Sequence, residues 1–216
     1  MKLVKNDTVL FLGDSITDCD RDRQDPHDLG HGFARLVADQ LAEKFPTAGF
    51  TFYNRGIGGN KAADVLARLQ EDCLQLAPDV LVFMIGINDT WHNAGGPDFG
   101  SEAAATSFEA TYRQILEQVT QQGITRIFLL EPFVLPYPED RQTWRIDLDP
   151  KIQIVRRLAA AFHCQLLPLD GLFAEASVAS SPQALTGDDG VHPTPAGHAL
   201  IANQLMARLA FLLKGK

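Results

Sequence analysis

Short apolar runs alternate with longer segments of helical periodicity along this chain. Five of the runs are rich in strand-forming residues and end at glycine, proline or polar residues: 8–12, 50–54, 79–85, 124–130 and 163–169. The run at 79–85 is almost continuously apolar, which is typical of a central parallel strand that is covered on both faces. The pattern therefore predicts five β-strands.

Between these runs, apolar residues recur every three or four positions, which is the spacing of one buried helix face. The last helix is expected to begin near Pro195, because proline suits a first helical position. The segment that leads to Asp189 is less regular, and the proline-rich stretch 132–138 is predicted to be loop. The helix positions that we expect to be buried are Phe33, Leu36, Val37, Leu41, Phe45, Val65, Leu66, Leu69, Cys73, Ala104, Phe108, Tyr112, Ile115, Leu116, Val119, Ile152, Val155, Leu158, Ala159, Phe162, Ile201, Leu205, Leu209 and Leu212.

Strands that alternate with helices indicate parallel pairing, right-handed crossovers and helices on both faces of the sheet. The predicted fold class is therefore α/β: a three-layer α/β/α sandwich with a five-stranded parallel sheet, of the flavodoxin-like type. The 216 residues contain no low-complexity linker and no internal repeat, so we expect a single domain over residues 1–216.

Charge and cysteine content narrow the function classes. The formal net charge is −8 at pH 7 and no basic patch or stripe is visible, which argues against a nucleic-acid partner. Cys19, Cys73 and Cys164 are odd in number and widely spaced, so neither a disulfide framework nor a zinc site is indicated, and we expect no metal and no cofactor. No apolar run approaches the roughly 18 residues of a membrane span, and no signal-peptide h-region is visible. We therefore expect a cytoplasmic protein without a membrane partner.

The residues that could carry chemistry follow the predicted strands. Ser15 comes directly after the first strand, in a Gly-Asp-Ser turn, and the loops after later strands carry Gly58, Asn88 and the pair Asp189 and His192. Because the carboxyl ends of parallel strands meet at one edge of a sheet, we expect these residues to lie close together. A serine needs a neighbouring base to become a nucleophile, and a carboxylate orients a histidine for that task. The sequence therefore predicts a Ser-His-Asp hydrolytic site.

Acyl transfer also needs donors for the oxygen that becomes negative in the tetrahedral intermediate. The Ser15 N–H, a glycine N–H at Gly58 and the Asn88 side-chain amide could supply three. Gly56 and Gly59 are so close to Gly58 that spacing alone does not decide which glycine donates. Asn88 could instead bind loop backbone, as asparagine often does.

Four sequence blocks resemble the motif blocks of the SGNH hydrolase superfamily, also called GDSL esterases/lipases. They are Gly13-Asp14-Ser15-Ile16, Gly58, Gly86-Ile87-Asn88-Asp89 and Asp189-Gly190-Val191-His192. The blocks stand in the order and approximate spacing of that superfamily and span nearly the whole chain; Ile16 replaces the leucine of the GDSL name. The resemblance implies that Ser15 is the nucleophile, His192 the general base and acid, and Asp189 its orienting carboxylate. It likewise implies an oxyanion hole made by Ser15, Gly58 and Asn88.

Residues 13–19, with Arg21 or Arg23 nearby, and 86–91 also resemble intracellular acetyl xylan esterases of this superfamily. This resemblance implies a serine esterase whose partner is a small-molecule acyl ester and which deacetylates acetylated xylo-oligosaccharides. A lysophospholipase or thioesterase that acts on longer acyl chains is the alternative, followed by a non-catalytic carbohydrate-binding module. The sequence leaves the oligomeric state open, a homo-oligomer included.

Three further residues are candidates for substrate binding: Asp14, Arg55 and Trp91. Each has a structural alternative. Asp14 could tie down the turn, Arg55 could be a surface arginine or pair with an acid, and Trp91 could pack in the core. The loops 18–30, 92–100 and 133–147 are expected to shape the pocket or an interface.

Overall fold

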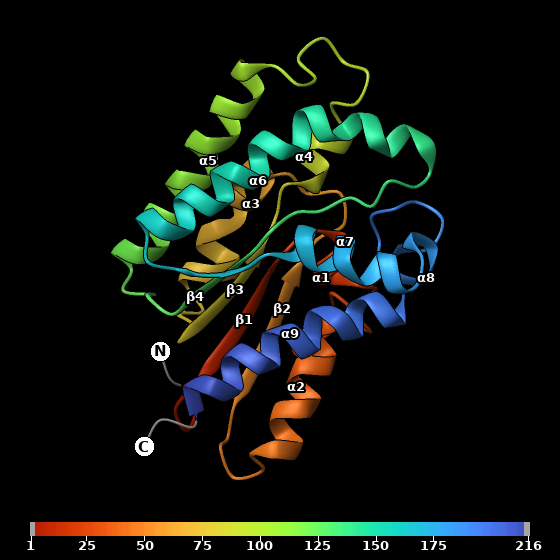
Figure 1. Ribbon diagram of the computed structural model, residues 1–216. Coiled ribbons are helices and arrows are strands. Elements are labelled where there is room, and N and C mark those ends of the chain that lie inside the picture. Colours follow the sequence, from red (N-terminus) through yellow and green to blue (C-terminus); the bar gives the residue numbers. More distant parts are fainter. Residues whose placement is uncertain (1–2, 214–216) are drawn as a thin grey trace.

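The computed structural model describes residues 3–213, with side chains described through Leu209. Its centre is a five-stranded, wholly parallel sheet, as predicted, with the strand order β2-β1-β3-β4-β5 (Figure 1). The strands are β1 (Thr8–Gly13), β2 (Thr51–Gly56), β3 (Val80–Met84), β4 (Ile127–Leu130) and β5 (Gln165–Leu167). The last two are shorter than the apolar runs that predict them.

Helices cover both faces of the sheet, which confirms the three-layer α/β/α architecture. Residues of α3, α5 and α6 pack on one face, and residues of α2, α7 and α9 pack on the other (Figure 1). The helices are α1 (Ser15–Asp18), α2 (Phe33–Lys44), α3 (Ala62–Leu69), α4 (Ile87–Trp91), α5 (Glu102–Gln121), α6 (Arg145–Ala161), α7 (Leu169–Ala179), α8 (Pro182–Thr186) and α9 (Pro195–Leu213), with a π-helical turn η1 (Gln70–Leu74) and a 3₁₀ turn η2 (Glu139–Trp144).

Alternate residues of each strand point into opposite layers, and helices cover both layers, so 9–12 of β1 and all of β3 are apolar and buried. Phe11 of β1 pairs in register with Val82 of β3 and packs toward α2 and α9, whereas Leu10 packs toward α3 and α5. The predicted helix faces are buried or half-buried throughout the described part of the chain. The Leu212 side chain lies outside the described residues.

Two predictions of irregular structure were wrong. The segment before Asp189 contains α7 and α8, and the second half of the expected loop 133–147 is η2 followed by the start of α6. The α7 helix fully buries only Leu169 and Phe173, and alanine, serine and glycine fill most of its other positions. Its periodic signal is therefore too weak to read from the sequence.

The strand order reverses at β1, next to the candidate residues. β1 is flanked by β2 on one side and by β3 on the other, so the connections on either side of β1 run in opposite directions. Such a reversal opens a gap at the carboxyl ends of the strands, where ligands bind in open α/β folds. Ser15 follows β1 and Asn88 follows β3, on the two sides of this gap.

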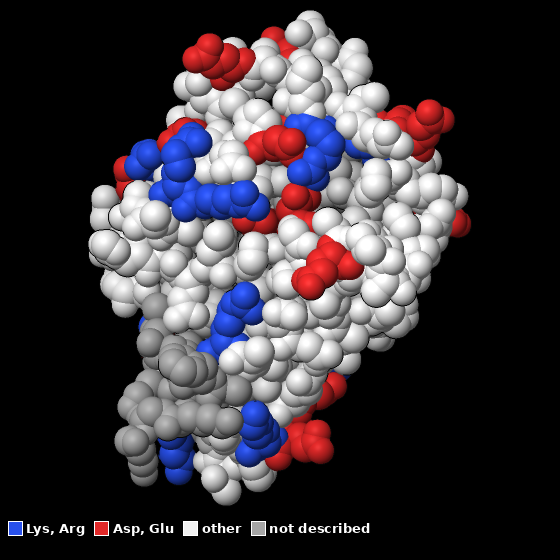
Figure 2. All heavy atoms as spheres, in the orientation of Figure 1, with Lys and Arg blue, Asp and Glu red and all other residues white. Residues whose placement is uncertain are grey.

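The surface charge and the apolar character of the helices complete the description. On the face drawn in Figure 2, basic and acidic side chains are interspersed over the described residues. Within residues 3–213, no helix combines the length and the apolar character that crossing a membrane requires.

Candidate active site

Ser15, His192 and Asp189 form a continuous hydrogen-bonded chain. The Ser15 Oγ lies 2.8 Å from His192 Nε2, and His192 Nδ1 lies 2.5 Å from Asp189 Oδ2. The other carboxylate oxygen of Asp189 accepts the backbone N–H groups of Val191 at 2.8 Å and of His192 at 2.9 Å. Since an ionised carboxylate only accepts, Nδ1 carries the ring proton and Nε2 is free to accept from the serine hydroxyl. The structure thus brings together the three residues that the sequence predicts.

The electrostatics of the pair follow from this geometry. Burial acts to raise the pKa of Asp189, but the hydrogen bonds from the His192 ring and from two backbone N–H groups outweigh it and lower that pKa. The hydrogen bond to Asp189 raises the pKa of His192 above its ordinary value, against the opposing effect of burial. The arrangement therefore stabilises a positive charge on His192 and a negative charge on Asp189.

The backbone around Ser15 is fixed by a short helix. Asp14 caps α1 by accepting the Ile16 N–H at 3.0 Å, and Cys19 ends it in the left-handed conformation with φ of 41°. The Ser15 N–H opens this helix, where an N–H has no intrahelical acceptor. Asp14 itself is fully buried, and burial raises its pKa to about 7. These are the surroundings of the structural alternative, in which Asp14 ties down the turn.

The glycine loop after β2 lies beside Ser15, but the N–H of Gly58 is already engaged. It donates to Asp18 Oδ2 at 3.1 Å, and a Cβ built on Gly58 would lie 3.8 Å from the Ser15 Cβ. The next residue, Gly59, is exposed, has a φ of +80°, and its N–H has no acceptor within the described part of the chain. Of the two glycines, Gly59 has the available donor.

Asn88 is 4% exposed at the start of α4. Its Nδ2 donates one N–H to the backbone carbonyl of Asn60 at 3.0 Å. The hydrogen bond from Asn88 to loop backbone, which the sequence analysis gave as the alternative role, is therefore present. Because a side-chain amide has two N–H groups, this bond leaves the second for a ligand.

The two remaining substrate candidates differ in their surroundings. Arg55 donates to the carbonyls of Pro26, in loop 18–30, and of Asn54, and lies over the ring of Tyr53. Its Nε also lies 3.8 Å from Asp72 Oδ1, which is the pairing with an acid that the sequence left open. Trp91 lies beside the catalytic candidates instead: its ring centroid is 5.7 Å from that of His192. Trp91 therefore has a position from which it could wall the site.

Arg141 and Gly190 contribute to this site although the sequence did not single them out as candidates. Arg141 donates from Nε to the Asp189 carbonyl at 2.8 Å, and its guanidinium stacks over both Trp144 and Trp91. Gly190 has a φ of +75°, and a Cβ there would lie 1.9 Å from the Tyr137 carbonyl oxygen. Neither contact has a local sequence signal, because both join segments about 50 residues apart.

Comparisons with known proteins agree with this geometry. The sequence pattern of the GDSL-like Lipase/Acylhydrolase family matches residues 11–200. The chain belongs to this family.

Relatives of the hydrolase include an acetylxylan esterase from Geobacillus stearothermophilus, 32% identical over 98% of this chain and 97% of that protein. Among solved structures, Axe2, an acetylxylan esterase from the same organism, is 30% identical and superposes with a TM-score of 0.85 over 100% of both chains. A protein from Parabacteroides merdae described as a GDSL-like lipase is 32% identical, with a TM-score of 0.88 over 97% of this chain and 98% of the other. The protein is therefore a carboxylic ester hydrolase with the SGNH hydrolase fold.

The hydrolase has a second histidine near Ser15. His198 of α9 is 6% exposed; its Nδ1 accepts the Phe33 N–H at 3.2 Å, and its Nε2 lies 3.3 Å from the Cys19 Sγ. Because Nδ1 accepts, the neutral ring carries its proton on Nε2 and donates to the sulfur. Burial lowers the pKa of His198 to about 4, the opposite direction from His192, so His198 is neutral at pH 7.

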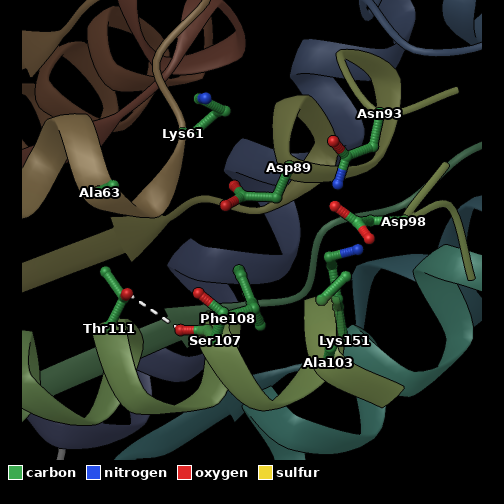
Figure 3. A pocket seen from close by; sticks show the side chains of 11 residues that line it. Lys61, Ala63, Asp89, Asn93, Asp98, Ala103, Ser107, Phe108, Thr111 and Lys151 are labelled. Atoms are coloured by element: carbon green, nitrogen blue, oxygen red, sulfur yellow. Dashed lines mark hydrogen bonds between the residues drawn. The ribbon is translucent and has the colours of Figure 1, made fainter. Parts of the chain in front are cut away.

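A cavity of about 330 Å³ adjoins α4, the short helix that carries Asn88 (Figure 3). Asp89 and the buried Lys151 line it, and neither Ser15 nor His192 does. Both oxygens of Asp89 accept the Ala62 N–H, at 3.1 and 3.3 Å, and burial raises the pKa of Asp89 to about 6. Asp89 thereby ties α4 to the start of α3.

Proposed function

We propose that this hydrolase cleaves short-chain acyl esters through Ser15, His192 and Asp189, with acetylated xylo-oligosaccharides as the first substrates to test. The observation that carries the proposal is the chain of contacts from the serine hydroxyl through the imidazole to the carboxylate, with 2.8 Å at the first step. A nucleophile, its base and a third group that orients the base are the parts that this chemistry needs.

In the first half of the reaction, Ser15 Oγ attacks the ester carbonyl and its proton passes to His192 Nε2. The imidazolium is stabilised by Asp189, which already holds the other ring nitrogen. His192 then gives this proton to the oxygen of the departing alcohol. In the second half, His192 takes a proton from the water that attacks the acyl-serine carbonyl. As the bond to Ser15 Oγ breaks, His192 returns this proton to the serine oxygen, and the carboxylic acid is released.

We assign the oxyanion hole to the Ser15 N–H, the second N–H of the Asn88 amide and the N–H of Gly59. Gly59 replaces the predicted Gly58 because the Gly58 N–H already donates to Asp18. Each such donor is typically worth about 3 kcal/mol of transition-state stabilisation.

The substrate class rests on two supports. Relatives of about 30% identity are described as acetylxylan esterases, and Trp91 offers a flat aromatic surface beside His192 on which an acyl or sugar group can pack. The predicted cytoplasmic location and a homo-oligomeric state stay predictions.

The test combines a variant with a substrate series. Ser15→Ala should abolish turnover and labelling by a fluorophosphonate while leaving the melting temperature nearly unchanged, and retained turnover would refute the role of Ser15. With p-nitrophenyl esters, a sharp preference for acetate supports the proposed substrates. Activity that rises toward octanoate would instead favour the lysophospholipase or thioesterase alternative, and no adduct on Ser15 in folded protein would favour a binding module.

A further inference from the structure

The segment 58–62, which carries the Gly59 N–H of the proposed oxyanion hole, is held from several directions. Asp18 binds the Gly58 N–H, and Asp89 binds the Ala62 N–H. Asn60, midway between them, offers its carbonyl to the Asn88 amide at 3.0 Å. The direction of the Asn88 amide therefore depends on where Asn60 lies.

Asn60 in turn is held by Arg68. The Arg68 side chain, on α3, is 14% exposed and donates from Nε to Asn60 Oδ1 at 2.8 Å. Its Nη2 donates to the carbonyl of Gly13 at 2.9 Å, directly before the turn that carries Ser15. Its Nη1 donates to the Arg55 carbonyl at 2.8 Å and to Asp72 at 2.7 Å. One guanidinium thus joins the ends of β1 and β2 to the glycine loop.

The planarity of the Asn88 amide carries this constraint to the reacting centre. The two N–H groups on Nδ2 lie in one plane at a fixed angle, so a bond from one of them to Asn60 sets the direction of the other. A donor acts on the transition state only if it is already aimed at the position of the developing oxyanion.

We propose that Arg68 is a positioning residue for the oxyanion hole, which it orients by fixing Asn60 against the Asn88 amide. The inference rests on the proposed function, in which Asn88 donates to the oxyanion. Arg68 touches neither substrate nor Ser15 Oγ. Its role is specific to arginine, because the planar fork reaches four acceptors in fixed directions, whereas the lysine ammonium is a point charge on a flexible stem.

The decisive experiment is a double-mutant cycle between Arg68→Lys and Asn88→Ala, read as kcat and KM for p-nitrophenyl acetate. Arg68→Lys alone should lower kcat by about 10- to 100-fold with KM within about threefold, because small misplacements of catalytic groups cost up to about 100-fold in rate. In the Asn88→Ala background, the same change should lower kcat by less than about twofold, since the amide that Arg68 orients is gone. An undiminished loss in that background would overturn the proposal.

Arg126→Lys is the matched control for lost stability. Arg126 makes a bidentate ion pair with Asp7, at 2.6 and 2.8 Å, and contacts Asp79 at the amino ends of the strands, opposite the site. Arg126→Lys should lower the melting temperature by about as much as Arg68→Lys does, without changing kcat. Equal losses of kcat in Arg68→Lys and Arg126→Lys would reduce the role of Arg68 to stability and overturn the proposal.

Asn60→Ala keeps the proposal testable should Arg68→Lys fail to fold. It removes the Oδ1 acceptor of Arg68 but retains the Asn60 carbonyl, so kcat should again fall with KM nearly unchanged; an unchanged kcat would overturn the proposal. A separate result would refute the proposed function: turnover of substrate by Ser15→Ala. If Ser15→Ala abolishes labelling, the proposed function stands. If the effects of Arg68→Lys and Asn88→Ala on kcat are then additive, this inference alone is refuted.

Discussion

His198 predicts a specific pH dependence of stability. Burial lowers its pKa in the folded protein to about 4, against an ordinary value of 6.5. Between these two pH values the unfolded chain binds a proton at this position and the folded protein does not, so the free energy of unfolding must fall as the pH falls. At about 1.4 kcal/mol for each pH unit, the loss attributable to His198 is about 3 kcal/mol. The contribution is intact above pH 6.5 and is lost by about pH 4.

The variant His198→Asn isolates this contribution. The asparagine Oδ1 stands near the position of Nδ1, so it can still accept the Phe33 N–H, but asparagine does not titrate. The variant loses the contact with Cys19 and the stacking on Phe33, so it should be less stable than the wild type at pH 7.

The assay is urea unfolding of both proteins between pH 4 and 7.5, monitored by circular dichroism. The stability difference between wild type and His198→Asn should shrink by about 3 kcal/mol from pH 7 to pH 4. The carboxylates that also titrate in this range, Asp14 and Asp89, are present in both proteins and cancel in the difference. A difference that stays constant with pH would show that His198 is not held neutral by burial, and would refute the reasoning.

Three further predictions concern catalysis. The proposed base must be neutral to act, so kcat/KM should rise with pH and reach half of its plateau above pH 6.5, because Asp189 and the charge of Asp14 raise the pKa of His192. Asp14→Asn can keep the cap of α1 but removes a buried charge that raises the pKa of His192. The pH–rate profile of this variant should therefore shift to lower pH. A shift to higher pH would contradict the assignment of His192 as the base. Gly190→Ala should lose most activity and lower the melting temperature, because the new Cβ meets the Tyr137 carbonyl and the left-handed conformation costs alanine about 1–2 kcal/mol; wild-type kcat would contradict this.

The sheet and the triad candidates were predictable because their signals are local. β3 is apolar at every position, as a strand covered on both faces must be. Ser15 follows β1 and Asn88 follows β3 directly, so the parallel topology alone brings them to one edge. Asp189 and His192 are three residues apart, close enough for one turn to join them.

What the sequence could not predict depends on contacts between distant segments. Whether Gly58 or Gly59 has a free N–H is decided by Asp18, which lies 40 residues before Gly58. Arg141 reaches the Asp189 carbonyl across 48 residues. No periodicity or motif encodes such pairs, since each is set by how two loops pack.

Ser15 and His192, the proposed nucleophile and base, are separated by 177 positions in the chain. At a synthesis rate of about 5–20 residues per second, the histidine is made on the order of 10 to 40 seconds after the serine. In the proposed mechanism, nascent chains that have not yet reached His192 therefore hold the nucleophile without its base and cannot hydrolyse esters by this route. Hydrolytic activity in a translation reaction would consequently report chains that extend past His192 and have closed this long-range contact.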